Sequence, residues 1–289
     1  MQATNRPLFR RLLAAALCLC TAIGFRCKEE SEIYFEEENV VQNAGLGIVE
    51  GYDALEVAYY AEAMLKASAG GISVADNCGL YTNNPNTHVV TISFGDCATS
   101  ASYPYKRIRS GKILVQYNNV VGDTLANRTL TFEDYFVSGK RLEGEIFISD
   151  IRRDTVDSLL HSVCTFRNFK ISFPNGTNVT YNGSHTRVWT FGEGDNVSTN
   201  NTYSVTMLTD SLNISGPATR TFKTAIPSPV KLNYACAITG KLAATAGTIQ
   251  VNEISGMGAG ARNVSFGDGT CDNAVSVTTT QRTFGASVL

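Results

Sequence analysis

The sequence predicts a mainly β protein with antiparallel sheets, arranged as a sandwich or an extended meander and preceded by a short N-terminal helix. Three observations predict this class. From Ile72 onward, apolar and polar residues alternate with a period of two. Candidate strands recur every ~8–15 residues and are separated by turn residues, without helical crossovers. The composition agrees, because the chain has 25 glycines and only 17% charged residues.

The N-terminal helix is predicted over Asp53–Ala67, with Asp53 as its N-cap and Gly70-Gly71 as its end. The residues that recur at helical spacing are Leu55, Tyr59, Glu62 and Leu65. Before the helix, Ser31–Asn43 is acidic and has no sustained apolar period, which indicates a solvated tether. Residues 27–71 are therefore expected to form an acidic tether and a helix.

An antiparallel β region is predicted over residues 72–289, and we consider two similar halves within it, about 72–160 and 161–289. Alternation is clearest at Asn168–Phe173, and turns are predicted at Pro174-Asn175-Gly176 and Asn182-Gly183. The other candidate strands are Val89–Phe94, Lys112–Tyr117, Thr129–Phe136, Glu145–Ser149, Arg187–Phe191, Thr202–Leu208, Thr219–Ala225, Lys231–Ile238, Thr248–Val251, Asn263–Phe266 and Ala274–Thr279.

A short motif occurs twice, as ISFGDC at 92–97 and as VSFGDGTC at 264–271. In both copies an alternating strand runs into a Gly-Asp turn, and a cysteine follows that can fasten the strand end to a neighbour. Outside the cytoplasm such cysteines oxidise readily. The predicted disulfides are Cys78–Cys97 and Cys236–Cys271, which leaves Cys164 as a buried thiol.

The first 26 residues are predicted to be an export signal. Arg6, Arg10 and Arg11 form a positive region, and the apolar run from Leu12 to Ala22 is too short to span a bilayer. Cys27 then opens the acidic sequence CKEESE, a layout typical of a bacterial lipoprotein whose cysteine is acylated. The alternative is cleavage after Ala22-Ile23-Gly24, which would release a secreted or periplasmic protein.

Three further segments carry a resemblance to a family. They are TISFGDC to LEGEIFIS, then ISFPNGTNVTYNGSHTRVWTFGEGD, and finally CAITGKL to SFGDGTCDN, within about residues 78–280. The chain resembles the uncharacterised β-rich surface lipoproteins of Bacteroidota-type bacteria. The resemblance implies lipidation at Cys27, with the following Lys28 and acidic residues directing the protein to the outer membrane and the cell surface. It implies no activity.

No catalytic residues, metal ligands or cofactors are predicted. The chain lacks a G-x-S-x-G elbow, an H-E-x-x-H motif and a P-loop. The oxygen-rich stretch Asp268–Asn273 lacks the spacing of a calcium loop, which favours a local turn. A net charge of −2 with both signs dispersed argues against a nucleic-acid partner.

Arg187, Trp189 and Phe191 share one face of a candidate strand and are a candidate sugar-stacking platform, with a core strand as the alternative. The leading hypothesis is an exported, lipid-anchored cell-envelope protein with a non-catalytic binding or structural role. It would contact the membrane through its lipid, and a surface glycan or an envelope protein as partner. The alternative is a β-sandwich glycan-binding or glycan-active module.

Overall fold

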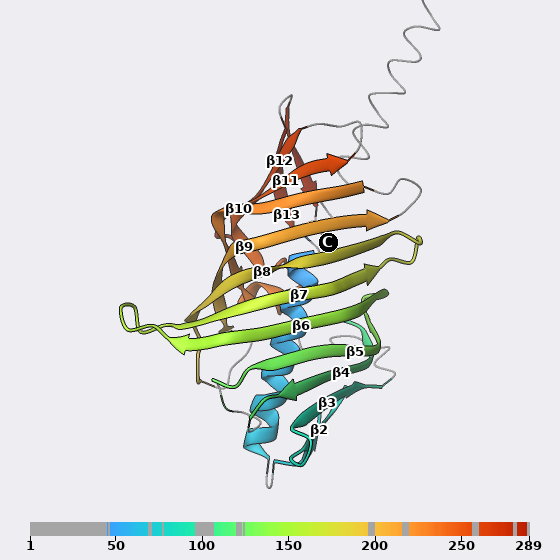
Figure 1. The fold of residues 1–289 in the computed structure, drawn as a ribbon, viewed down its shortest axis with the longest axis vertical. Coiled ribbons are helices and arrows are strands. Elements are labelled where there is room, and N and C mark those ends of the chain that lie inside the picture. Colours follow the sequence, from blue (N-terminus) through green and yellow to red (C-terminus); the bar gives the residue numbers. More distant parts are fainter. Residues whose placement is uncertain are drawn as a thin grey trace, which may run out of the picture. The chain divides into compact units, whose positions relative to one another are not determined.

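The computed structural model describes residues 45, 47–68, 71–76, 78–95, 107–119, 123, 125–195, 200–215, 220–255, 260–279 and 282–287. Their strands form one antiparallel sheet of fourteen strands, in which every strand pairs with the next along the chain (Figure 1). The predicted antiparallel fold with a preceding helix is confirmed, in its meander form. Sequential antiparallel pairing needs only short connections, which the turn-rich sequence supplies.

The strands differ in length, and the longest lie in the middle of the sheet. The first seven are β1 (Ser73–Ala75), β2 (Gly79–Asn84), β3 (Val89–Phe94), β4 (Arg109–Tyr117), β5 (Arg128–Val137), β6 (Lys140–Arg153) and β7 (Leu160–Ser172). The others are β8 (Asn178–Phe191), β9 (Thr202–Ser215), β10 (Arg220–Asn233), β11 (Ala244–Ser255), β12 (Ala261–Asp268), β13 (Ala274–Thr278) and β14 (Thr283–Ser287). A helical turn, α2 (Tyr234–Ala237), separates β10 from β11.

Three expectations about elements need correction. Tyr234–Ala237, placed in a strand by its apolar residues, is helical because the Asn233 side chain caps the turn by accepting from the Ala235 amide. Asn182-Gly183 lies inside β8, where the Asn182 side chain accepts from the Asn168 amide across a register shift in the neighbouring strand. Three short strands, β1, β2 and β14, are absent from the predicted set.

The helix spans residues 47–67 and lies against one face of the sheet, crossing its strands (Figure 1). It therefore begins before Asp53, which is an interior residue and not the N-cap. The sequence does not indicate this earlier start, because Gly47 and Gly51 discourage a helix by intrinsic propensity. A Cβ at Gly47 would lie 2.4 Å from the Tyr181 ring, and one at Gly51 would lie 2.3 Å from the Phe166 ring. These glycines let the helix approach the sheet closely.

Two glycines lie at irregular points of the sheet where the strands bend locally. Gly111 (φ 82°) of β4 passes so close to β5 that a Cβ would lie 1.9 Å from the Asp134 carbonyl oxygen. Gly144 (φ 95°) of β6 does the same to Asn168 of β7, at 2.2 Å. Both positions coincide with register shifts in the strand pairing. Such bulges increase twist and bend the strands locally, which allows the sheet to curve.

The core lies between the helix and the inward side chains of the sheet. Phe166 is at its centre, with its ring 5.9 Å from that of Tyr52 on the helix and 5.5 Å from that of Phe169. The two copies of the repeated motif present their residues alike: Ile92 and Phe94 of β3 are buried, and so are Val264 and Phe266 of β12. Each copy thus fills the core with the same alternation.

Candidate functional site: a charged cavity beside the helix

Four acidic side chains of the helix are buried: Glu50, Asp53, Glu56 and Glu62. The first three stand three residues apart, and each such step turns the side chain by about 60° around the helix axis. The acids therefore face different parts of the surrounding sheet. Because an unpaired buried carboxylate is strongly destabilising, each needs a partner from the strands.

Two strands supply buried arginines to these acids. Arg109 of β4 donates from Nη1 and Nη2 to the two carboxylate oxygens of Asp53, at 2.8 and 2.9 Å. Its Nη1 also donates to the Tyr135 hydroxyl at 2.6 Å. Arg128 of β5 donates to Glu62 at 2.7 Å. The forked guanidinium suits this geometry, because it serves two oxygens at once.

Glu50 is shared between two cations. Arg107 Nη2 and Lys140 Nζ each lie 2.7 Å from its Oε1 atom, and Arg107 Nη1 is also 3.2 Å from Asp53. Burial alone would raise the pKa of Glu50, but the attraction of Arg107 and Lys140 outweighs it and lowers the pKa to about 2. Glu50 therefore stays ionised over the physiological pH range and holds both cations in place.

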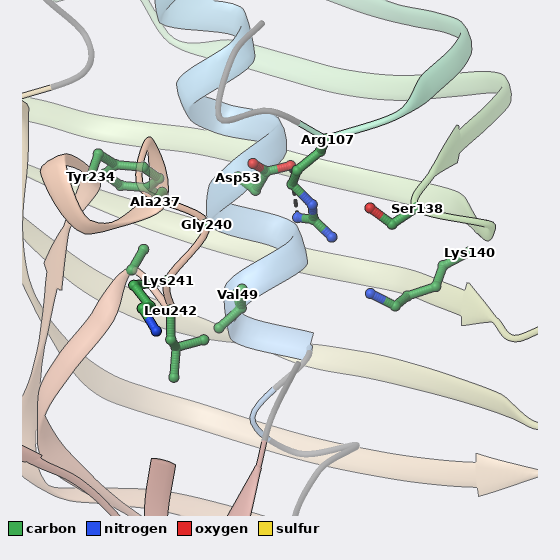
Figure 2. A pocket seen from close by; sticks show the side chains of 11 residues that line it. Val49, Asp53, Arg107, Ser138, Lys140, Tyr234, Ala237, Gly240, Lys241 and Leu242 are labelled. Carbon is green, nitrogen blue, oxygen red and sulfur yellow. Dashed lines mark ion pairs between the residues drawn. The ribbon is translucent and has the colours of Figure 1, made fainter. Parts of the chain in front are cut away.

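A cavity of about 340 Å³ opens beside this cluster (Figure 2). Figure 2 shows α2 and the turn after it on one side of the helix, and Ser138 and Lys140 of the β5–β6 hairpin on the other. The residues that line the cavity are Val49, Asp53, Arg107, Ser138, Lys140, Tyr234, Ala237, Gly240, Lys241, Leu242 and Ala243. Segments from four parts of the chain thus build one concave site.

The wall formed by α2 is fastened at several points. Cys236, which is fully buried, is disulfide-bonded to Cys271, with their Cα atoms 5.2 Å apart. After the turn, the Leu242 amide donates to the Asn273 side chain at 2.9 Å. The disulfide and this hydrogen bond therefore tie the wall to the segment between β12 and β13.

The charged groups in the cavity wall are mostly positive. The wall contains three cations, Arg107, Lys140 and Lys241, and one acid, Asp53. Asp53 also forms an ion pair with Arg109. Lys241 is exposed, and the described residues place no ion-pair partner beside it. The remaining wall is largely apolar, with Val49 on the helix and Leu242 and Ala243 after α2. Such a site is suited to a ligand with a negative charge and an apolar part.

Glu56 is not among the residues that line this cavity, and it differs from the other acids. Its Oε2 accepts a hydrogen bond from Asn201 Nδ2 at 2.9 Å, while Oε1 has no hydrogen-bond partner. Burial raises its pKa to about 7, and the nearby Tyr203 hydroxyl, the Asn201 amide and the Arg187 charge offset only part of this effect. Near neutral pH, Glu56 is thus partly protonated.

The candidate platform residues have separate environments. Arg187 is buried, donates to the Tyr59 hydroxyl of the helix and lies over the Tyr203 ring, 4.7 Å from its centroid. Trp189 packs at 5.2 Å against the Tyr59 ring and is only 8% exposed. Phe191, two residues further along β8, is 62% exposed. The first two therefore belong to the helix–sheet core.

The structure tests part of the predicted cysteine pairing. The Cys236–Cys271 disulfide is confirmed. Cys78 is disulfide-bonded, while its predicted partner Cys97 lies outside the described residues, as does Cys27. Cys164 is a free, buried thiol, as predicted.

The oxygen-rich stretch after β12 forms local turns. Asp268 accepts from the Thr270 amide at 3.2 Å, and Asp272 accepts from the Ala274 amide at 3.0 Å. These bonds are typical of Asx turns. Within the described ranges, no cluster of His, Cys, Asp and Glu is arranged to hold a metal ion.

Comparison with family models, curated proteins and solved structures found no match to this chain. Among the described residues, no helix is both long and apolar enough to cross a membrane. The function must therefore be inferred from the site itself.

Sequence reasoning missed the residues of this cavity. One signal was present, because Glu50, Asp53 and Glu56 recur every third residue within an otherwise apolar segment. Acids at such positions in a buried helix require partners, mostly cations, from elsewhere in the fold. Nothing in the sequence shows which of the 24 lysines and arginines those partners are.

Proposed function

We propose that this chain is an exported cell-envelope protein, anchored by acylation of Cys27, whose β region has a non-catalytic binding role. The observation that carries the binding role is the cavity of about 340 Å³ beside Glu50, Arg107 and Lys140. Its volume falls within the range of small-molecule sites, near the lower end. A small-molecule ligand in this cavity is therefore the proposed function of the site.

The rest of the inner face supports this choice of site. The helix covers the inward surface of the central strands, and the large aromatic side chains there, such as Tyr135, Phe166 and Tyr181, are fully buried. These buried rings are therefore not available for stacking against a sugar. The cavity, in contrast, combines a concave shape with convergent polar groups.

Blocking the cavity tests the binding role. Ala237→Phe places a ring in the wall of the cavity, whereas Ala235→Phe places the same ring on the exposed side of α2. We expect Ala237→Phe to abolish binding of ligands found in a thermal-shift screen that includes small organic acids and oligosaccharides. Ala235→Phe should bind them as the wild type does. Ligands that bind both variants equally would place the binding site elsewhere.

The anchor is tested separately. We expect the protein to carry diacylglycerol at Cys27, to partition into detergent and to resist extraction by salt, because acyl chains bind membranes by burial of CH₂ groups. Cys27→Ala should abolish lipid labelling. A mature N-terminus at Phe25, found by mass spectrometry, would show a released protein instead.

A further inference from the structure

We infer that the cavity binds a small organic carboxylate with an apolar body, and that Lys241 holds the carboxylate. This inference rests on the proposed binding function and names the class of ligand for the same site. The evidence lies in the spare donors of the wall, in the sign of its charge and in its apolar surface.

Spare hydrogen-bond donors are available on each cation. A lysine ammonium has three donors and a guanidinium has five. Lys140 is hydrogen-bonded to Glu50 at 2.7 Å, and Arg107 is bonded to the same atom at 2.7 Å. Both cations thus have donors left for a ligand, while their bonds to Glu50 hold their side chains in place. Such preorganisation reduces the entropy lost on binding.

The sign of the charge favours an anion. Asp53, the acid in the wall, is bound by Arg109 through both oxygens and by Arg107 at 3.2 Å. Its charge is therefore compensated before a ligand arrives. Lys241 has no acidic partner among the residues that the structure describes, so the site has an uncompensated positive charge. A cationic ligand would meet repulsion there.

The apolar part of the wall favours an organic acid over an inorganic anion. Val49 and Leu242 stand beside the charged groups, with Ala237 and Ala243 completing the apolar surface. Contact of this surface with a ligand removes apolar area from water, which favours a ligand with a hydrocarbon body. Inorganic phosphate would bind the cations but would leave this apolar surface exposed to water.

Three probes of similar size test the inference by titration calorimetry: phenylacetate, phenylacetamide and phenethylamine, with inorganic phosphate as a fourth. We expect phenylacetate to bind at least tenfold more tightly than the neutral amide and the phosphate, and the amine not to bind. The affinity for phenylacetate should fall as salt is added, because the recognition is electrostatic.

Matched variants locate the charge recognition. Lys241→Gln should weaken phenylacetate binding about tenfold, which corresponds to the loss of one charge-assisted hydrogen bond. Lys223→Gln removes the same charge from the exposed surface of β10, outside the cavity wall, and should leave the affinity unchanged. Circular dichroism confirms that each variant is folded.

The outcomes separate the two proposals. Equal binding of phenylacetate and phenylacetamide, or an unchanged affinity in Lys241→Gln, would overturn the carboxylate inference. If only neutral or cationic ligands bind and Ala237→Phe blocks them, the proposed binding function stands without this ligand class. If no ligand is sensitive to Ala237→Phe, both proposals are wrong.

Discussion

Glu56 illustrates how one residue in this fold responds to its surroundings. It shares the helix with Glu50 and Asp53, yet its partner is the neutral amide of Asn201 and one of its oxygens has no hydrogen bond. Glu50 is held between two cations and remains charged. The difference follows from which residue outside the helix each acid meets, since the burial of the two side chains is almost the same.

The raised pKa of Glu56 predicts a pH dependence of stability. The folded protein binds the proton of Glu56 up to pH of about 7, whereas the unfolded chain releases it near its ordinary pKa of 4.5. The free energy of unfolding should therefore fall as pH rises from 4.5 to 7, by up to about 3 kcal/mol from this residue alone. Denaturant titrations across this pH range measure the effect.

A glutamine at this position provides the comparison. Glu56→Gln retains an oxygen that accepts from Asn201 but cannot ionise, so we expect the loss of stability between pH 4.5 and 7 to be markedly reduced. Glu133→Gln, at an exposed ion pair with Lys112, should leave the pH profile as in the wild type. A profile unchanged by Glu56→Gln would contradict the assignment.

At the scale of the element, the helix shows a conflict between local propensity and tertiary packing. Gly47 and Gly51 lower its intrinsic stability, and both lie where aromatic rings of the sheet touch the helix backbone. The close approach brings Tyr52 against Phe166 and Tyr59 against Trp189. Packing of this kind supplies most of the stability of helices in folded proteins.

Gly51→Ala tests which effect is larger. Alanine would favour the helix by about 1 kcal/mol. Its Cβ, however, would lie 2.3 Å from Phe166, whose ring is enclosed by Tyr52, Phe169 and Tyr181. Overpacking of this kind costs about 1–3 kcal/mol, and more where the neighbours cannot move. We therefore expect a net loss of up to about 2 kcal/mol in the free energy of unfolding.

Gly285→Ala is the matched control, because no atom lies within 4 Å of the added Cβ. It should change the free energy of unfolding by less than about 0.5 kcal/mol. Stabilisation by Gly51→Ala would show that the helix does not press against the sheet as closely as the structure indicates.

At the scale of the described part of the molecule, the contacts within the sheet and the contacts made by the helix differ in their separation along the sequence. Strand pairing is local, since each strand of the sheet binds the next along the chain. The helix adds contacts between residues far apart in sequence, such as Asp53 with Arg109 and Glu56 with Asn201, 56 and 145 positions apart. A meander without such contacts would resemble a repeat array, whose parts can unfold separately.

The long-range contacts predict that the helix and the sheet unfold together. Trp189, the only tryptophan in the chain, packs against Tyr59 of the helix, so its fluorescence reports on this interface. We expect its transition in denaturant to coincide with the loss of β signal in far-UV circular dichroism. Two separate midpoints would show that the helix detaches before the sheet unfolds.

The sequence by itself determined the class of fold and the disulfide in the cavity wall formed by α2. Alternation with a period of two, as in Val89–Phe94 and Asn263–Phe266, depends only on neighbours in the chain and on one buried face. Turn residues such as Pro174-Asn175-Gly176 act just as locally. The repeated motif with its cysteines led in the same way to the Cys236–Cys271 disulfide.

The tertiary structure decided the true start of the helix, the helical turn at Tyr234–Ala237 and the site. Whether Gly51 lies in a helix depends on Phe166, which stands in another element. The partners of Glu50 are separated from it by 57 and 90 positions. The pairing of these groups is an interaction through space, set by how the helix packs against the sheet, and a linear pattern of residues contains no measure of that packing.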